Sequence, residues 1–106
     1  MRRARRGRLA GDGPAPATGE RTAVLADWGG TRVEEIASGE VAVPVDFVQP
    51  HDEWVLVVRG HARLAVGGER FDLADGDWLL LPGGVPHRLE LVEPGTRWLA
   101  VHAPPA

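Results

Sequence analysis

Four residues whose side chains could bind a metal ion or hold a small molecule fall into two parts of the sequence. Gln49, His51 and Glu53 alternate along one short stretch, and His87 follows a Pro- and Gly-rich loop, residues 82–86. Imidazole, carboxylate and amide oxygen together suit iron, manganese, nickel or zinc when no thiolate is present. A mononuclear centre of this kind could polarise a substrate or activate a water molecule.

The same residues have a second interpretation, in which no metal is involved. Buried polar side chains need hydrogen-bond partners whether or not a metal is present. Gln49, Glu53 and His87 could therefore simply hydrogen-bond within the mouth of a barrel. The residue types alone leave both interpretations open.

The length and composition restrict the classes of protein that fit. The chain has 106 residues, which is one domain, and it contains no cysteine. A disulfide framework, a thiolate zinc site and a cysteine nucleophile are thereby excluded, and a cytoplasmic location is expected. No apolar run approaches the roughly 18 residues that a membrane helix needs, so no membrane association is expected.

The charge is distributed unevenly along the chain. Five of the twelve basic residues are arginines within the first eight positions, and the rest of the chain holds seven arginines against fifteen acidic residues. An acidic body argues against a nucleic-acid-binding surface on the folded domain. Residues 1–22 are rich in Arg, Gly, Pro and Ala and lack periodicity, so we expect a disordered tail before a folded domain at 23–106.

Short β-prone runs separated by turn residues fill most of the chain after the tail. The expected strands are residues 32–37, 40–48, 53–59, 61–66, 69–73, 77–81, 87–92 and 97–102. Gly67-Gly68 predicts a two-residue hairpin, and Pro44 indicates that its run is an edge strand. Many short strands with frequent turns are typical of an antiparallel sandwich or barrel.

Three further expectations concern local structure. Residues 23–28 are expected to form a short helix or packed arm that Trp28 anchors to the body. The last two runs, 87–92 and 97–102, are expected to pair with each other across the turn at 93–96. The charges of Arg88 and Glu90 must face water, so alternation turns His87, Leu89 and Leu91 inward.

Two motifs resemble those of the cupin superfamily. Gly76-x5-Pro82-x-Gly84-x2-His87 is similar to the second cupin motif, and Glu53-x6-Gly60 is similar to the last half of the first. The stretch Gln49-Pro50-His51-Asp52-Glu53-Trp54-Val55 also resembles the Gln-x3-Glu-Trp-Val signature of small single-domain cupins. The resemblance implies an all-β fold, a small antiparallel β-barrel of the jelly-roll type. It also implies a homodimer, as do apolar strands such as residues 54–58 and 78–81.

The chain departs from the usual cupin pattern at the metal site. The two histidines of the common H-x-H pair are replaced by Phe47 and Gln49, and the Asn that often closes the second motif is replaced by Leu91. Glu53 and His87 are then the firmest expected ligands, followed by Gln49, with His51 as an adaptable fourth. Phe47, Trp98 and His102 are expected to line the pocket, the last two by strand alternation.

These observations predict a protein that binds a small polar molecule inside the barrel. The first hypothesis is binding through a divalent transition metal, in a metal-dependent enzyme. The alternative hypothesis is a metal-free cupin that binds or senses a small molecule without catalysis. Fold alone does not decide between them.

Overall fold

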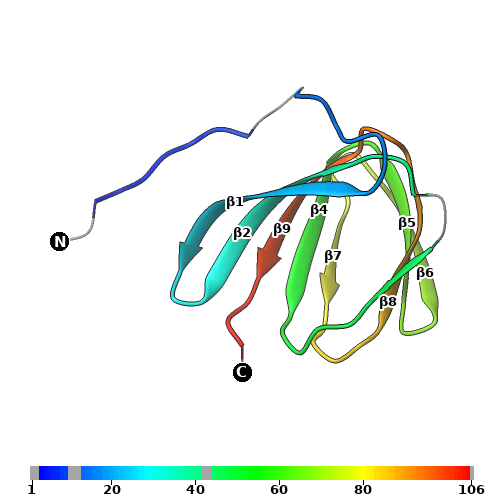
Figure 1. The fold of residues 1–106 in the computed structure, drawn as a ribbon. Helices are drawn as coiled ribbons and strands as arrows, with labels where there is room; N and C mark the ends of the chain where they lie inside the picture. Colours follow the sequence, from blue (N-terminus) through cyan, green and yellow to red (C-terminus); the bar gives the residue numbers. More distant parts are fainter. Residues whose placement is uncertain (1–2, 10–12, 42–43, 106) are drawn as a thin grey trace.

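Two antiparallel sheets packed face to face enclose the interior of the protein (Figure 1). The computed structural model describes residues 3–9, 13–41 and 44–105. In spatial order, the five-stranded sheet contains β1 (Glu20–Trp28), β2 (Thr31–Ser38), β9 (Arg97–His102), β4 (Glu53–Arg59) and β7 (Trp78–Leu81). The four-stranded sheet contains β3 (Val45–Phe47), β8 (His87–Val92), β5 (His61–Val66) and β6 (Glu69–Ala74). The arrangement confirms the predicted all-β jelly roll, and the described residues contain no helix that could cross a membrane.

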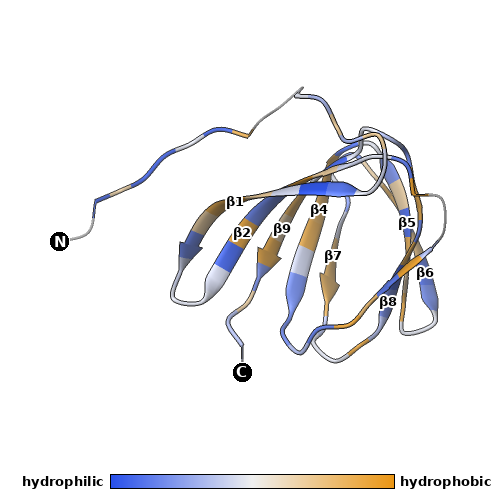
Figure 2. Ribbon diagram, viewed as in Figure 1, coloured by the Kyte–Doolittle hydropathy of each residue, from blue (hydrophilic) through white to orange (hydrophobic). Residues whose placement is uncertain are grey.

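Side-chain alternation explains why these strands form two packed layers. Val55 and Val57 of β4 and Ala100 of β9 point from one sheet into the core, and Leu64 and Leu89 point into it from the other. Figure 2 shows that β4 is hydrophilic where it begins and hydrophobic along most of its remaining length. The polar start of β4 therefore lies at one end of an otherwise apolar interior.

Four strands have the bounds that the sequence predicts, namely β4, β5, β8 and β9. The Gly67-Gly68 hairpin is confirmed: both glycines have positive φ, 55° and 88°, as a two-residue turn of this kind requires. β3 is an edge strand, as Pro44 indicates, but it is limited to Val45–Phe47. Residues 42–43 of the longer expected run lie outside the described residues.

The prediction for residues 23–28 is wrong. They form the greater part of β1, which pairs with β2 and begins at Glu20, inside the expected tail. Gly29 and Gly30 have φ values of 56° and 82° and close this hairpin as Gly67 and Gly68 close the other. Trp28 does not anchor an arm to the body, since it is 48% exposed.

The predicted pairing of the last two strands is also wrong. β8 lies between β3 and β5, whereas β9 lies between β2 and β4 in the other sheet. The turn between them crosses from sheet to sheet and is bonded to both. The Glu93 amide donates to the His61 carbonyl of β5 at 2.9 Å, and the Gly95 amide donates to the Ser38 carbonyl of β2 at 2.8 Å.

The predicted inward orientation of Leu91 is wrong, because β8 contains a β-bulge. Arg63 of β5 pairs with Leu91 and Leu64 pairs with Leu89, so Glu90 is an extra residue in β8. An extra residue reverses the alternation beyond it. His87 and Leu89 are buried as predicted, but Leu91 is 42% exposed and Val92 takes the inward position.

Candidate functional site

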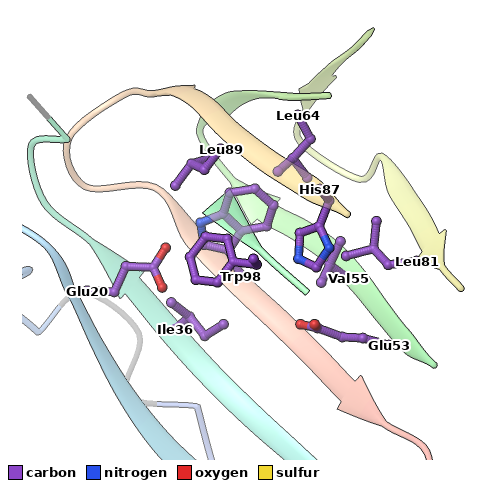
Figure 3. A pocket seen from close by; sticks show the side chains of 10 residues that line it. Glu20, Ile36, Glu53, Val55, Leu64, Leu81, His87, Leu89 and Trp98 are labelled. Carbon is purple, nitrogen blue, oxygen red and sulfur yellow. The ribbon is translucent and has the colours of Figure 1, made fainter. Parts of the chain in front are cut away.

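A cavity of about 90 Å³ lies between the two sheets (Figure 3). Its polar lining comes from Glu53 at the start of β4, His87 at the start of β8 and Glu20 at the start of β1. Its apolar walls include Phe47 and Trp98, two of the residues expected to line a pocket. The cavity therefore brings together polar side chains from three strands in an apolar enclosure.

His87 is held at the cavity by the strands of the four-stranded sheet. Its ring stacks on Phe47 of β3 with 5.5 Å between centroids. Beside this contact, the Arg88 guanidinium donates two hydrogen bonds to the Asp46 carboxylate, at 2.6 and 3.2 Å, and so lowers the pKa of Asp46. His87 is 7% exposed, and its buried Nδ1 has no hydrogen-bond partner within the described part of the chain.

Glu53 faces the same cavity from the other sheet. Its side chain is 12% exposed, and the Gln49 amide donates a hydrogen bond to its Oε1 at 3.3 Å. His102 Nε2 lies 3.8 Å from Glu53 Oε2. Glu53 and His87, which lie 34 residues apart in the chain, thus line the same cavity.

His51 and His102 form a polar cluster next to Glu53, and neither is among the lining residues of the cavity. His51 Nε2 lies 2.9 Å from His102 Nδ1, and His102 Nε2 lies 2.7 Å from Glu34 Oε1. His51 therefore faces His102, whose other ring nitrogen lies near Glu34 and Glu53. This cluster fixes the end of β9 against β2 and the segment that precedes β4.

Backbone contacts join the two cupin-like motifs to each other. The Gly84 amide donates to the Gln49 carbonyl at 2.8 Å, and the Gly83 amide donates to the Asp52 carboxylate at 2.7 Å. A Cβ at Gly83 would collide with the Pro50 carbonyl. Only glycine permits this approach, which places the segment before Glu53 directly against the loop before His87.

Glu20 also lines the cavity, although it lies within residues 1–22, which were expected to form a disordered tail. The residue as a whole is exposed at the edge of the sheet, but its carboxyl group points into the cavity beside Trp98 (Figure 3). Burial of this end raises the pKa of Glu20, the Ser38 hydroxyl at 3.5 Å opposes that effect, and the charges of Glu53 and Glu34 add to it. The Gly29-Gly30 hairpin signal, read together with residues 20–28, would have identified the strand that carries Glu20.

Replacing Glu20 by Gln is expected to stabilise the fold at neutral pH. A carboxyl whose folded-state pKa is raised favours folding below its unfolded pKa, and this contribution is lost as the pH rises through the folded value. The variant should therefore be slightly more stable than the wild type at pH 7 and lose this advantage in acid. Urea denaturation across the acid range measures the difference, and an unchanged difference at every pH would contradict the assignment.

Two of the four expected metal ligands, Glu53 and His87, line the cavity. Within residues 3–9, 13–41 and 44–105, no three His, Asp or Glu side chains come close enough together to hold a metal ion. The cavity offers the Glu53 carboxylate and the His87 imidazole, while the Gln49 amide N–H is bonded to Glu53. Glu53 and His87 supply two donors, and the side-chain oxygen of Gln49 would have to supply the third that a catalytic zinc or non-haem iron site needs.

The chain belongs to the cupin domain family, whose pattern matches residues 32–102. An uncharacterised protein of Streptomyces coelicolor is 37% identical over 62 residues, which is 57% of this chain. The match spans 59% of that curated relative's own length.

Solved structures of similar proteins cover more of the chain. A Ralstonia eutropha JMP134 protein, described as a "putative mannose-6-phosphate isomerase", is 34% identical and superposes with a TM-score of 0.84, over 95% of this chain and 99% of its own. KdgF from a Halomonas species is 21% identical with a TM-score of 0.74, over 83% and 81% of the two chains. The second likeness shows the fold alone.

Proposed function

We propose that this cupin binds a small polar molecule in the cavity, in direct contact with Glu53 and His87. The main support is the buried His87 Nδ1 that has no partner within the described residues. Buried polar atoms are almost always hydrogen-bonded in folded proteins, so a ligand group that reaches the His87 ring would supply the partner that this nitrogen lacks. The Glu53 carboxylate, on the facing sheet, offers that group a second polar contact.

The size of the cavity limits the ligand. Pockets for drug-sized molecules have volumes of roughly 300–1,000 Å³, whereas this cavity measures about 90 Å³. Val55, Leu64 and Leu89 supply apolar surface around the polar pair. A short molecule with one polar end and an apolar body matches both the volume and the lining.

Binding through a divalent metal is the second candidate, and the cupin family supports it. Here Glu53 and His87 would be the ligands, with Gln49 next, and the metal would supply Lewis acidity in a metal-dependent enzyme. We favour direct binding because, among the described residues, no three His, Asp or Glu side chains lie close enough together to hold a metal ion. The two candidates differ in metal content, which is measurable on the purified protein.

Ligand-binding NMR with a panel of short-chain alcohols, amines and carboxylic acids tests the proposal. We expect members of the panel to shift the Trp98 indole N–H resonance, since Trp98 lines the cavity. Glu53→Gln and His87→Phe should each weaken binding, whereas His61→Ala, at an outer position with 41% side-chain exposure, should not. Binding that persists in both site variants, or a panel that leaves Trp98 unmoved, contradicts the proposal.

We also propose that two copies associate through the outer face of the five-stranded sheet. Trp78 and Leu80 of the edge strand β7 are each 58% exposed, and Trp54 lies beside Trp78 with 6.1 Å between ring centroids. Contiguous exposed apolar surface on an edge strand favours a partner, and a two-fold contact uses the same patch on both chains.

Light scattering at micromolar concentration should give a mass of about twice 11.4 kDa. Trp78→Glu should convert the protein to a folded monomer, because it places a charge in the centre of the contact. Arg70→Glu, on the other sheet, is the control and should leave the mass unchanged. A wild-type mass near that of one chain would refute this assembly.

A further inference from the structure

The charged groups of the cavity have one sign. Glu53 and Glu20 contribute carboxylates from opposite sides of the cavity (Figure 3), and Glu34 is close enough to act on Glu20 electrostatically. No arginine is among the described lining residues, and the chain contains no lysine. The lining therefore carries two carboxylates and no arginine, and the basic side chains near it, Arg32 at 3.4 Å from Glu34 and His102 at 3.8 Å from Glu53, lie outside the cavity lining.

The Glu20 carboxylate has only a weak hydrogen bond within the protein to stabilise its negative charge. Its Oε1 accepts a hydrogen bond from the Ser38 hydroxyl at 3.5 Å, at the limit of such a contact. The Ser38 oxygen in turn accepts a hydrogen bond from the Trp98 indole N–H at 3.0 Å. Burial and the neighbouring carboxylates together raise the pKa of Glu20.

A second, independent observation indicates that this space receives a ligand. His87 is more than nine-tenths buried, lines the same cavity and leaves Nδ1 without a partner among the described residues. The imidazole and the two carboxylates thus surround one volume, in which a polar group would find a hydrogen-bond partner and two negative charges.

We propose that the ligand of this cavity is a small primary amine, bound in its protonated form between Glu20 and Glu53. This inference rests on the proposed function and specifies its ligand class. The ammonium group lies between the carboxylates, and the short apolar body of the ligand packs against Ile36, Val55 and Trp98. A sugar phosphate, the substrate class suggested by the description of the Ralstonia protein, would be repelled here, because its dianion would face two carboxylates in a cavity lined by no arginine.

Three compounds of equal chain length separate charge from shape: propylamine, 1-propanol and propionate. Shifts of the Trp98 indole N–H in the full-length protein report occupancy of the cavity. At neutral pH and low salt, we expect propylamine to bind roughly tenfold more tightly than 1-propanol, and propionate not to bind. Raising the salt concentration should reduce the preference for the amine.

Glu20→Gln is the test variant because it removes one carboxylate and keeps the shape of the side chain. It should lower the affinity for propylamine several-fold and leave 1-propanol binding unchanged. Glu69→Gln, at an exposed position of β6, is the matched control and should change neither. Any of three results would overturn the inference and leave the proposed function standing. They are equal binding of propylamine and 1-propanol, tighter binding of propionate, and an unchanged preference for the amine in Glu20→Gln. Failure of all three compounds to move the Trp98 signal would overturn both.

Discussion

Replacing Trp98 by Ala should cost about 3–5 kcal/mol of unfolding free energy, the range for truncating a buried Trp. Trp98 is 5% exposed, belongs to the core cluster and forms a wall of the cavity. Its indole N–H is bonded to Ser38, which is fully buried, so the variant also leaves a hydroxyl without its donor. Denaturant titration followed by circular dichroism measures the loss.

Two variants separate the contributions of Trp98. Trp98→Phe keeps most of the ring and removes the N–H, so it should lose more stability than the roughly 1 kcal/mol of one hydrogen bond but less than the alanine variant. Trp28→Ala removes an indole that is 48% exposed and should cost clearly less than Trp98→Ala. Equal losses for Trp98→Ala and Trp28→Ala would contradict the assignment of Trp98 to the core.

Replacing Gly83 by Ala should damage stability and ligand binding together. The new methyl group collides with the Pro50 carbonyl, and relief of that collision breaks the bond from the Gly83 amide to Asp52. Overpacking and the loss of a bond to a charged group together suggest a cost of about 2–4 kcal/mol. Because this contact holds the segment before Glu53 against the loop before His87, propylamine binding should also fall. Thermal denaturation and the Trp98 NMR signal measure the two effects.

Gly84→Ala is the neighbouring control for Gly83→Ala. Nothing lies within 4 Å of a Cβ at Gly84, but its φ of 77° is unfavourable for alanine. Strain of this kind costs about 1–2 kcal/mol, so Gly84→Ala should be the milder change and retain more binding. A larger effect at Gly84 than at Gly83 would contradict the proposed contact between the two motifs.

The parts of the fold that the sequence predicts well are local. Glycine and proline residues interrupt the β-prone runs, and they define the bounds of β4, β5, β8 and β9 within the chain. Alternation correctly turns His87 and Trp98 inward. Both signals depend on residues that are close together in the sequence, where turn chemistry and pleating act directly.

The errors concern contacts that local patterns do not encode. β8 and β9 are neighbours in sequence, but their turn bonds to Ser38 and His61, two residues far away in the chain. The bulge at Glu90 depends on its partner strand β5. The missed strand β1 is different, because the Gly29-Gly30 turn signal that closes its hairpin is local and present in the sequence.

For the candidate site, too, the sequence predicts some residues well but does not predict contacts between distant segments. The sequence identified Glu53, His87, Phe47 and Trp98, which the structure places around one cavity, and Gln49, which contacts Glu53. It predicted His51 as a metal ligand and His102 as a pocket-lining residue; in the structure the two histidines contact each other, and His102 also lies 3.8 Å from Glu53. That contact depends on where β9 ends relative to the segment before β4, and residue spacing does not report it.

Elemental analysis of protein purified without a histidine tag tests most directly the claim that Glu53 and His87 bind the ligand themselves. Direct binding predicts a transition-metal content far below one atom per chain, in wild type and in Glu53→Ala, His87→Ala and His61→Ala alike. A stoichiometric metal in wild type and His61→Ala that is lost in both Glu53→Ala and His87→Ala would contradict direct binding and establish a metal centre at this cavity.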